Sequence, residues 1–130
     1  MQLKRQETAC PEKQDEISYD GKSFVTMRNS TNGEAGEKTR FCYHQSDRHI
    51  WAEYSGGGIV KGFLAGFVQR DGSLEFSYVH TNDMGNIRAG ECKSYPEILS
   101  DGRLTLHESW QWLNGDKSFG KSQLTEVSNA

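Results

Sequence analysis

Short runs of β-branched and aromatic residues alternate with clusters of turn-forming residues along most of the chain. The turn clusters read NSTNGEAGE, QSDRH, SGGG, RDG, NDMGN, SDGR and NGDK. The runs between them predict eight strands, at residues 23–29, 39–45, 49–55, 59–69, 73–81, 87–95, 103–112 and 118–127. No segment of a dozen residues has a 3.6-residue apolar period without a glycine or a turn inside it, so the pattern gives no sign of a helix.

Eight strands joined by short links pair as an antiparallel meander, because a parallel crossover needs a longer connection. A meander of this length removes its exposed edges most simply by closing on itself. The predicted fold class is therefore all-β, an eight-stranded antiparallel up-and-down meander closed into a β-barrel. Such a barrel is just wide enough to be filled by side chains or to hold one small ligand.

The pairing of the strands can be tested by centring each hairpin on its turn. Centring on Met84, Asp71 and Gly115 repeatedly sets a bulky ring opposite a glycine, which fills a narrow interior without overpacking it. These pairs are Tyr78 with Gly90, Phe76 with Gly66 and Trp110 with Gly120. Centring the remaining hairpin on Gly57 pairs Tyr54 with Val60, Ala52 with Gly62 and Ile50 with Leu64, and places Val60 on the inner face.

The glycines of YSGGGIVKGFLAGF raise the alternative of a phosphate-binding loop. A P-loop needs GxxxxGK followed by Ser or Thr, and a dinucleotide-binding turn needs GxGxxG leading into a helix. Here Lys61 is followed by Gly62 and the chain continues as a strand. Residues 56–58 are therefore predicted to form a hairpin turn.

Polar and aromatic residues of the inner face gather toward one end of the predicted barrel. The links NSTNGEAGE, SGGG, NDMGN and NGDK share this end, and leucines occupy the other. An apolar floor below a mouth of aromatic and hydrogen-bonding groups is typical of a small-ligand site. Arg88 would supply a fixed cation, His80 a titratable group and Trp110 a flat wall for an anionic or aromatic ligand. The candidate ligand-binding residues are Tyr54, Tyr78, His80, Arg88, Glu108, Trp110 and Trp112.

A structural interpretation of the same residues stays open. Arg88 can form an ion pair with an inward Glu108 while Trp110 stacks on its guanidinium. A single inward histidine is often a hydrogen-bonded structural group, and aromatic residues at a barrel mouth pack with their polar tips in water. The barrel would then be filled and would serve a structural or interaction role.

Catalysis has less support in the sequence than binding. No Ser/His/Asp pattern, HExxH or GxSxG motif is present. Glu108 and His80 could act as an acid–base pair, since burial raises a carboxyl pKa. The other histidines expected near the strands, His44, His49 and His107, are predicted to face outward or lie near a turn. We therefore assign no catalytic residues and expect neither a metal site nor a cofactor.

Length and charge place further limits on the function. A chain of 130 residues is expected to form one domain with a single core. A net charge of −3 gives no reason to expect nucleic acid or an anionic membrane as a partner. Residues 1–18 form a polar leader that lacks the apolar region of a secretory signal, and we expect it to be flexible. The barrel domain is assigned to residues 19–127 and a short tail to residues 128–130.

Three cysteines, Cys10, Cys42 and Cys92, are odd in number and widely spaced. No pair has the spacing of a zinc site or a redox motif. They are predicted to be buried or inert thiols, which favours a reducing, cytoplasmic location.

The predicted strand at residues 59–69 is apolar on both faces. Phe63, Ala65 and Phe67 alternate on its outer face. A strand of this kind is normally covered on both sides. Either the N-terminal leader or a second copy of the chain could cover it, and we expect a homodimer.

Four blocks of the sequence resemble a family of short bacterial proteins that consist of little more than this domain. The blocks are YSGGGIVKGFLAGF, DGSLEFSYVHTN, YPEILSDGRLTLHESWQW and NGDKSFGKSQLTEV, and the resemblance covers residues 19–127. The family is similar in fold to avidin-like barrels within the wider lipocalin-like, or calycin, group. The resemblance thus implies the same closed barrel, and it brings no catalytic residues with it.

Members of this family often carry the label N-acetylglutamate synthase, which implies acetyl-CoA-dependent N-acetyl transfer as an alternative function. Acetyl-CoA-binding N-acetyltransferases hold the pyrophosphate on a Gln/Arg-x-x-Gly-x-Gly/Ala turn at a helix N-terminus. The nearest match is QRDGSL at residues 69–74, where Leu74 replaces the final small residue and a hairpin is predicted in place of the helix. Likeness to avidin does not imply biotin binding either, because fold does not fix function.

Overall fold

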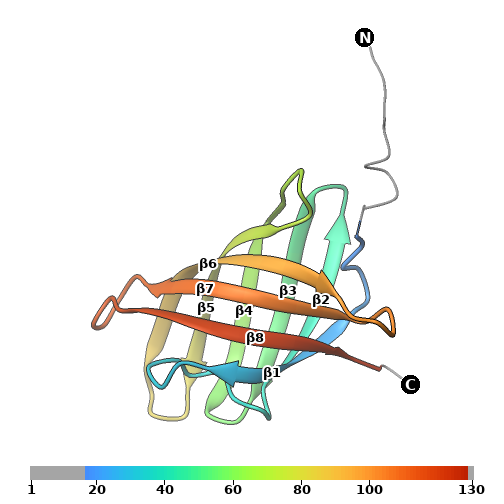
Figure 1. The fold of residues 1–130 in the computed structure, drawn as a ribbon. Helices are drawn as coiled ribbons and strands as arrows, with labels where there is room; N and C mark the ends of the chain where they lie inside the picture. The colour runs from blue at the N-terminus through green and yellow to red at the C-terminus, as the bar shows by residue number, and fades with distance from the viewer. Residues whose placement is uncertain (1–16, 129–130) are drawn as a thin grey trace.

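The structure, a computed structural model, describes residues 17–128 and contains eight strands in this range. They are β1 (Ser23–Asn29), β2 (Arg40–Ser46), β3 (His49–Gly56), β4 (Ile59–Val68), β5 (Leu74–Asn82), β6 (Ile87–Ile98), β7 (Leu104–Trp112) and β8 (Phe119–Val127). Each strand pairs antiparallel with the next, and β8 pairs with β1 to close the barrel (Figure 1). The predicted fold class is confirmed, and the largest difference in a strand boundary is at β6, which extends to Ile98 instead of residue 95.

The described residues include no helix that is long and apolar enough to cross a membrane. The leader predicted for residues 1–18 lies outside the described range except for residues 17 and 18, and so do residues 129 and 130 of the predicted tail.

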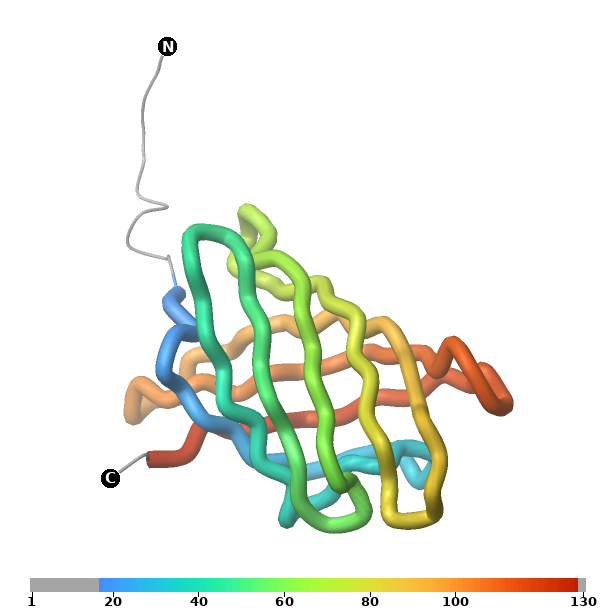
Figure 2. Tube along the Cα trace, turned by 180° about the vertical axis from the view of Figure 1, so that it is seen from behind, coloured from blue at the N-terminus to red at the C-terminus, as the bar shows by residue number. Residues whose placement is uncertain are grey.

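The strands form two groups that cross each other on opposite walls of the barrel. Figure 2 shows β2–β5 as neighbouring arms on the near wall, β6 bending from this wall to the other, and β7 and β8 running across behind them. The β3–β4 and β5–β6 turns lie side by side at one end, where the amide of Asp83 donates a hydrogen bond to the carbonyl of Gly58 at 2.9 Å. The sequence placed these two links at the same end, and the structure confirms it.

The predicted register is confirmed for three hairpins. Leu74 pairs with Val68, His80 pairs with Arg88, and Glu108 pairs with Ser122. Rings also lie over glycines as expected, since a Cβ added at Gly90 or Gly120 would overlap the ring that faces it. The ring–glycine pairs of these hairpins are Tyr78 with Gly90, Phe76 with Gly66 and Trp110 with Gly120.

The register predicted for the β3–β4 hairpin was wrong by two residues. Tyr54 pairs with Gly62 instead of Val60, because the turn is centred between Gly57 and Gly58, with Gly56 paired to Ile59, and one bulge near Val60 in β4 shifts the alignment further. As a result Ile59 is buried, with 3% of its surface exposed, whereas Val60 points outward at 57%. Gly56 has φ of 118° and lies against the backbone of the β1–β2 link, so only glycine fits there.

The floor of the barrel is apolar and closed. Its buried leucines are Leu74, Leu104, Leu106 and Leu124. Tyr19 is fully buried beneath the strands, packs against Tyr43 and donates a hydrogen bond from its hydroxyl to the carbonyl of Gly72 at 2.6 Å. Because this end is plugged, any small molecule that enters the barrel must come through the opposite mouth.

Candidate functional site

The mouth of the barrel collects side chains from the ends of several strands. Tyr54 lies near the end of β3, His80 near the end of β5, Arg88 at the start of β6 and Trp112 at the end of β7. Their rings and polar groups contact one another: the rings of His80 and Trp112 have centroids 5.8 Å apart. The structure therefore brings these four predicted site residues together.

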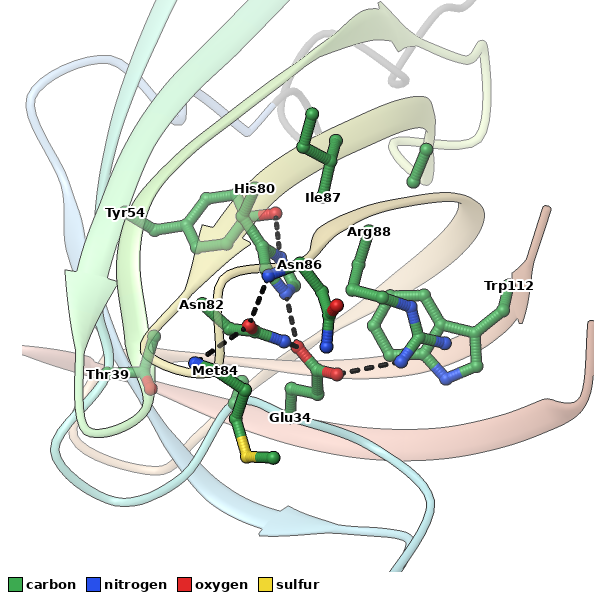
Figure 3. Close-up of polar contacts among 12 residues, drawn as sticks. Glu34, Thr39, Tyr54, His80, Asn82, Met84, Asn86, Ile87, Arg88 and Trp112 are labelled. Atoms are coloured by element: carbon green, nitrogen blue, oxygen red, sulfur yellow. Dashed lines mark hydrogen bonds and ion pairs between the residues drawn. The ribbon is translucent and has the colours of Figure 1, made fainter. Parts of the chain in front are cut away.

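Glu34, in the link between β1 and β2, lies at the centre of this group. Its Oε1 accepts hydrogen bonds from His80 Nε2 at 2.8 Å and from Asn82 Nδ2 at 3.1 Å. Its Oε2 accepts one from Arg88 Nη1 at 2.7 Å. Figure 3 shows the His80 and Arg88 side chains converging on this carboxylate. One loop side chain thus neutralises and orders the polar part of the mouth.

The pKa of the Glu34 carboxyl reflects this set of partners. Partial burial alone would raise it, but the hydrogen bonds from His80 and Asn82 and the charge of Arg88 lower the pKa below its ordinary value. Glu34 is therefore ionised near neutral pH and acts only as an acceptor.

His80 is held in one tautomer by its two partners. Burial lowers its pKa, although Glu34 opposes this effect, so the imidazole is neutral near pH 7. Its Nε2 lies next to the ionised Glu34 and must carry the proton. Its Nδ1 then accepts a hydrogen bond from the Tyr54 hydroxyl at 2.9 Å. Burial raises the pKa of Tyr54 as well, which keeps this hydroxyl protonated.

Arg88 has partners other than the ones predicted. The structural interpretation paired it with Glu108 and stacked Trp110 on it, but its ion pair is with Glu34. Its guanidinium carbon lies 3.9 Å from the ring centroid of Trp112. This correction has a simple cause: Arg88 is at the mouth, level with the β1–β2 link, whereas Glu108 lies deeper along β7.

The β1–β2 link is anchored to the mouth at several points besides Glu34. The indole Nε1 of Trp112 donates to the carbonyl of Asn32 at 3.0 Å. Asn32 Nδ2 donates to Ser118 Oγ at 2.9 Å and to the carbonyl of Phe119 at 2.8 Å. Trp112 therefore supports both Arg88 and the link that carries its counterion.

A cavity of about 60 Å³ lies below Glu34, inside the mouth. Aromatic and aliphatic side chains form most of its wall, and Glu34, Asn29 and Glu108 supply polar groups. Of the predicted site residues, Tyr54, Tyr78, His80, Glu108, Trp110 and Trp112 line it. Arg88 does not, because it lies beside the cavity on the far side of Glu34.

A family model described as avidin-like protein matches residues 17–127. The chain belongs to the avidin-like family. Searches of curated proteins and of solved structures found no match. An avidin-like barrel is in general suited to ligand binding, because its strands form a closed wall around an interior. The family match confirms the resemblance seen in the sequence as far as the barrel is concerned.

The match does not confirm the N-acetylglutamate synthase label. In this avidin-like barrel QRDGSL lies at the β4–β5 hairpin, where Gly72 donates its amide to the carbonyl of Gln69 at 3.0 Å. No helix begins there, so the turn lacks the helix N-terminus on which such enzymes hold a pyrophosphate.

Glu108 is a separate polar feature in the wall of the cavity. Burial raises the pKa of its carboxyl to about 7, although a hydrogen bond from the Ser122 hydroxyl at 2.8 Å opposes the rise. The Ser94 hydroxyl is near enough to lower this pKa, but its geometry falls short of a hydrogen bond. Glu108 and His80 form no hydrogen bond with each other, so the predicted acid–base pair is not in direct contact.

The two described cysteines differ in their surroundings. Cys92 is buried and lines the cavity, and burial raises its pKa well above the ordinary value. Cys42 is exposed and is a free thiol, so of the two alternatives, buried or inert, burial does not apply to it. Cys10 lies outside the described residues.

Sequence reasoning missed Glu34, Asn82 and Asn32, all of which lie in or beside links. One signal was available for Glu34. An inward arginine near a barrel mouth needs a counterion, and Glu34 is in the longest link predicted at that end. Asn82 and Asn32 belong to turn clusters, and nothing in the sequence distinguishes them from asparagines that only shape a turn.

Proposed function

We propose that this avidin-like barrel binds one small ligand in the cavity at its mouth. The observation that carries the proposal is the cavity itself, which persists in a barrel whose floor is fully packed. It combines aromatic walls with a few polar groups, a composition typical of small-molecule sites.

The size of the cavity limits the ligand. A single water needs roughly 10–15 Å³ by the same measure, so about 60 Å³ holds a few waters or a molecule of a few non-hydrogen atoms. A larger ligand such as biotin or acetyl-CoA requires the β1–β2 link to move away. We therefore propose that the protein is a binding module for a small metabolite. Its cytoplasmic location stays a prediction.

The test is thermal unfolding against a metabolite panel that includes small carboxylates, glutamate, biotin and acetyl-CoA. A ligand at about 100 times its Kd stabilises the folded chain by about 2.7 kcal/mol, which gives a clear rise in Tm. We expect Ala35→Leu, which fills the cavity from the β1–β2 link, to abolish the rise. Thr81→Leu places the same side chain on the exposed outer face of β5 and should leave it unchanged.

Two outcomes contradict the proposal. No rise in Tm with any compound favours the filled barrel. A rise that survives Ala35→Leu places the ligand outside the cavity. Formation of N-acetylglutamate from acetyl-CoA and glutamate would instead establish the acetyltransferase alternative.

A further inference from the structure

We infer that the mouth holds a carboxylate-binding site and that Glu34 occupies the place of the ligand's carboxylate in the closed barrel. The ligand class is then a small monocarboxylic acid, which displaces Glu34 from His80, Asn82 and Arg88. This inference rests on the proposed function and names the chemistry of the ligand at the same site.

The donors are built on rigid elements, while the acceptor comes from a link. His80 and Asn82 belong to β5 and Arg88 to β6, and these strands pair continuously from Leu74 to Thr81. Their three donor atoms lie 2.7–3.1 Å from the oxygens of one carboxylate. A preorganised set of this kind binds any carboxylate that reaches it, and charge-assisted hydrogen bonds to Arg88 make it selective for an anion.

The charges at the site favour one carboxylate and no more. Arg88 supplies one positive charge, and His80 is neutral because burial lowers its pKa. Exchange of the Glu34 carboxylate for that of a ligand keeps Arg88 paired. The second carboxylate of a dicarboxylic acid would have to enter the cavity beside Glu108 without a partner, which is costly.

The cavity offers room for the rest of the ligand directly below this site. Phe76, Tyr78 and Trp110 supply apolar contacts for a short carbon chain. Asn29 also lines the cavity, and its Oδ1 is buried without a hydrogen-bond partner. A hydroxyl or amino group on the ligand would donate a hydrogen bond to this oxygen. The cavity therefore offers the ligand a free hydrogen-bond acceptor as well as empty volume.

Glu34 can leave without unfolding the link that carries it. Its side chain is already 22% exposed, so an outward rotation brings the carboxylate into water. Asn32 on one side of it stays bound to Ser118 and Trp112. On the other side, Thr39 Oγ1 donates to the carbonyl of Gly56 at 3.0 Å. The exchange therefore requires only a local movement around residues 33–35.

The experiment compares acetate, butyrate and hexanoate with acetamide, butyramide and hexanamide by calorimetric titration and by Tm. We expect the carboxylates to bind and the amides to fail. Glu34→Gln removes the internal competitor and should tighten carboxylate binding about tenfold. Arg88→Met should abolish binding, also in the Glu34→Gln background. Glu37→Gln, an exposed residue of the same link, is the matched control and should change nothing.

The outcomes separate this inference from the proposed function. Amides that bind as tightly as carboxylates overturn the carboxylate site but leave a ligand-binding cavity. Carboxylate affinity that stays the same or falls in Glu34→Gln overturns the role of Glu34, and a gain in affinity cannot arise from misfolding. If neither series nor the metabolite panel shifts Tm in the wild-type chain or in Glu34→Gln, both the inference and the proposed function fail.

Discussion

The carboxylate of Glu34 lies 2.7 Å from the guanidinium of Arg88, although the two residues are 54 positions apart in sequence. Their ion pair closes the mouth of the barrel from the side of the β1–β2 link, and the ring of Trp112 packs against the guanidinium. The same carboxylate fixes the tautomer of His80. The polar organisation of the mouth thus depends on one residue outside the strands.

Glu34→Ala is expected to lower the free energy of unfolding by about 1–3 kcal/mol, because it leaves partly buried donors without their acceptor. Glu75→Ala is the control, since its ion pair with Lys93 is more than half exposed on both sides. That change should cost no more than about 1 kcal/mol. Urea unfolding measures both values, and equal losses would contradict the role given to Glu34.

Glu108 should make stability depend on pH. Its pKa is about 7 in the folded chain and near 4.5 in its ordinary state. Between these values the folded chain keeps a proton that the unfolded chain has lost, so stability falls as pH rises from about 4.5 to 7 and then levels off. The expected fall is on the order of 3 kcal/mol. His80 acts in the opposite sense, because its pKa is lowered on folding and protonation of the unfolded chain below about 6.5 reduces stability.

Glu108→Gln isolates this contribution. The variant keeps the shape of the side chain and cannot ionise, so the difference in unfolding free energy between variant and wild type should grow in favour of the variant from pH 5 to pH 8. Urea unfolding at four or five pH values is sufficient. A difference that is independent of pH would show that Glu108 has an ordinary pKa.

The ring–glycine contacts should be sensitive to a single methyl group. A Cβ at Gly120 would overlap the ring of Trp110, so Gly120→Ala is expected to destabilise the chain by about 1–3 kcal/mol. Gly36→Ala adds the same group where nothing lies within 4 Å, and it should be neutral or slightly stabilising. Thermal unfolding of the two variants compares them directly, and a tolerant Gly120 would argue against close packing at this contact.

Most of the fold could be predicted because the strand pattern and the ring–glycine pairs agree with each other. Centring each hairpin on its turn correctly pairs Tyr78 and Trp110 with the glycines that their rings cover. The β3–β4 hairpin was mispredicted because three consecutive glycines allow several turn geometries, and a bulge leaves no trace in the sequence. For this reason the prediction that Val60 points into the barrel was wrong.

The candidate site could be predicted only as far as it lies on strands. Tyr54, His80, Arg88 and Trp112 meet at the mouth as expected, since alternation and chain direction determine both their face and their height. Glu34 comes from a link, where side-chain direction follows from local backbone conformation and not from any period. The partner of Arg88 was therefore assigned to Glu108, the nearest carboxylate on a strand.

The outer face of β4 stays an apolar surface in the structure, and we propose that a second copy of the chain covers it. Phe63 and Phe67 are 50% and 48% exposed, with Ala65 between them. Sedimentation is expected to give a dimer for the wild type and a monomer for Phe63→Glu combined with Phe67→Glu. Met84→Glu, at an exposed turn of the mouth, is the control. A monomeric wild type would refute the proposal.

The most direct measurement of the central proposal uses the indole N–H signals of the three tryptophans in a ¹⁵N–¹H NMR titration with butyrate. Trp110 and Trp112 line the cavity, whereas Trp51 is on the outer face, stacked against His44. Binding in the cavity should shift the signals of Trp110 and Trp112 with one saturating curve and leave that of Trp51 in place. If all three signals stay fixed in both the wild type and Glu34→Gln, or if only that of Trp51 moves, butyrate does not bind in this cavity.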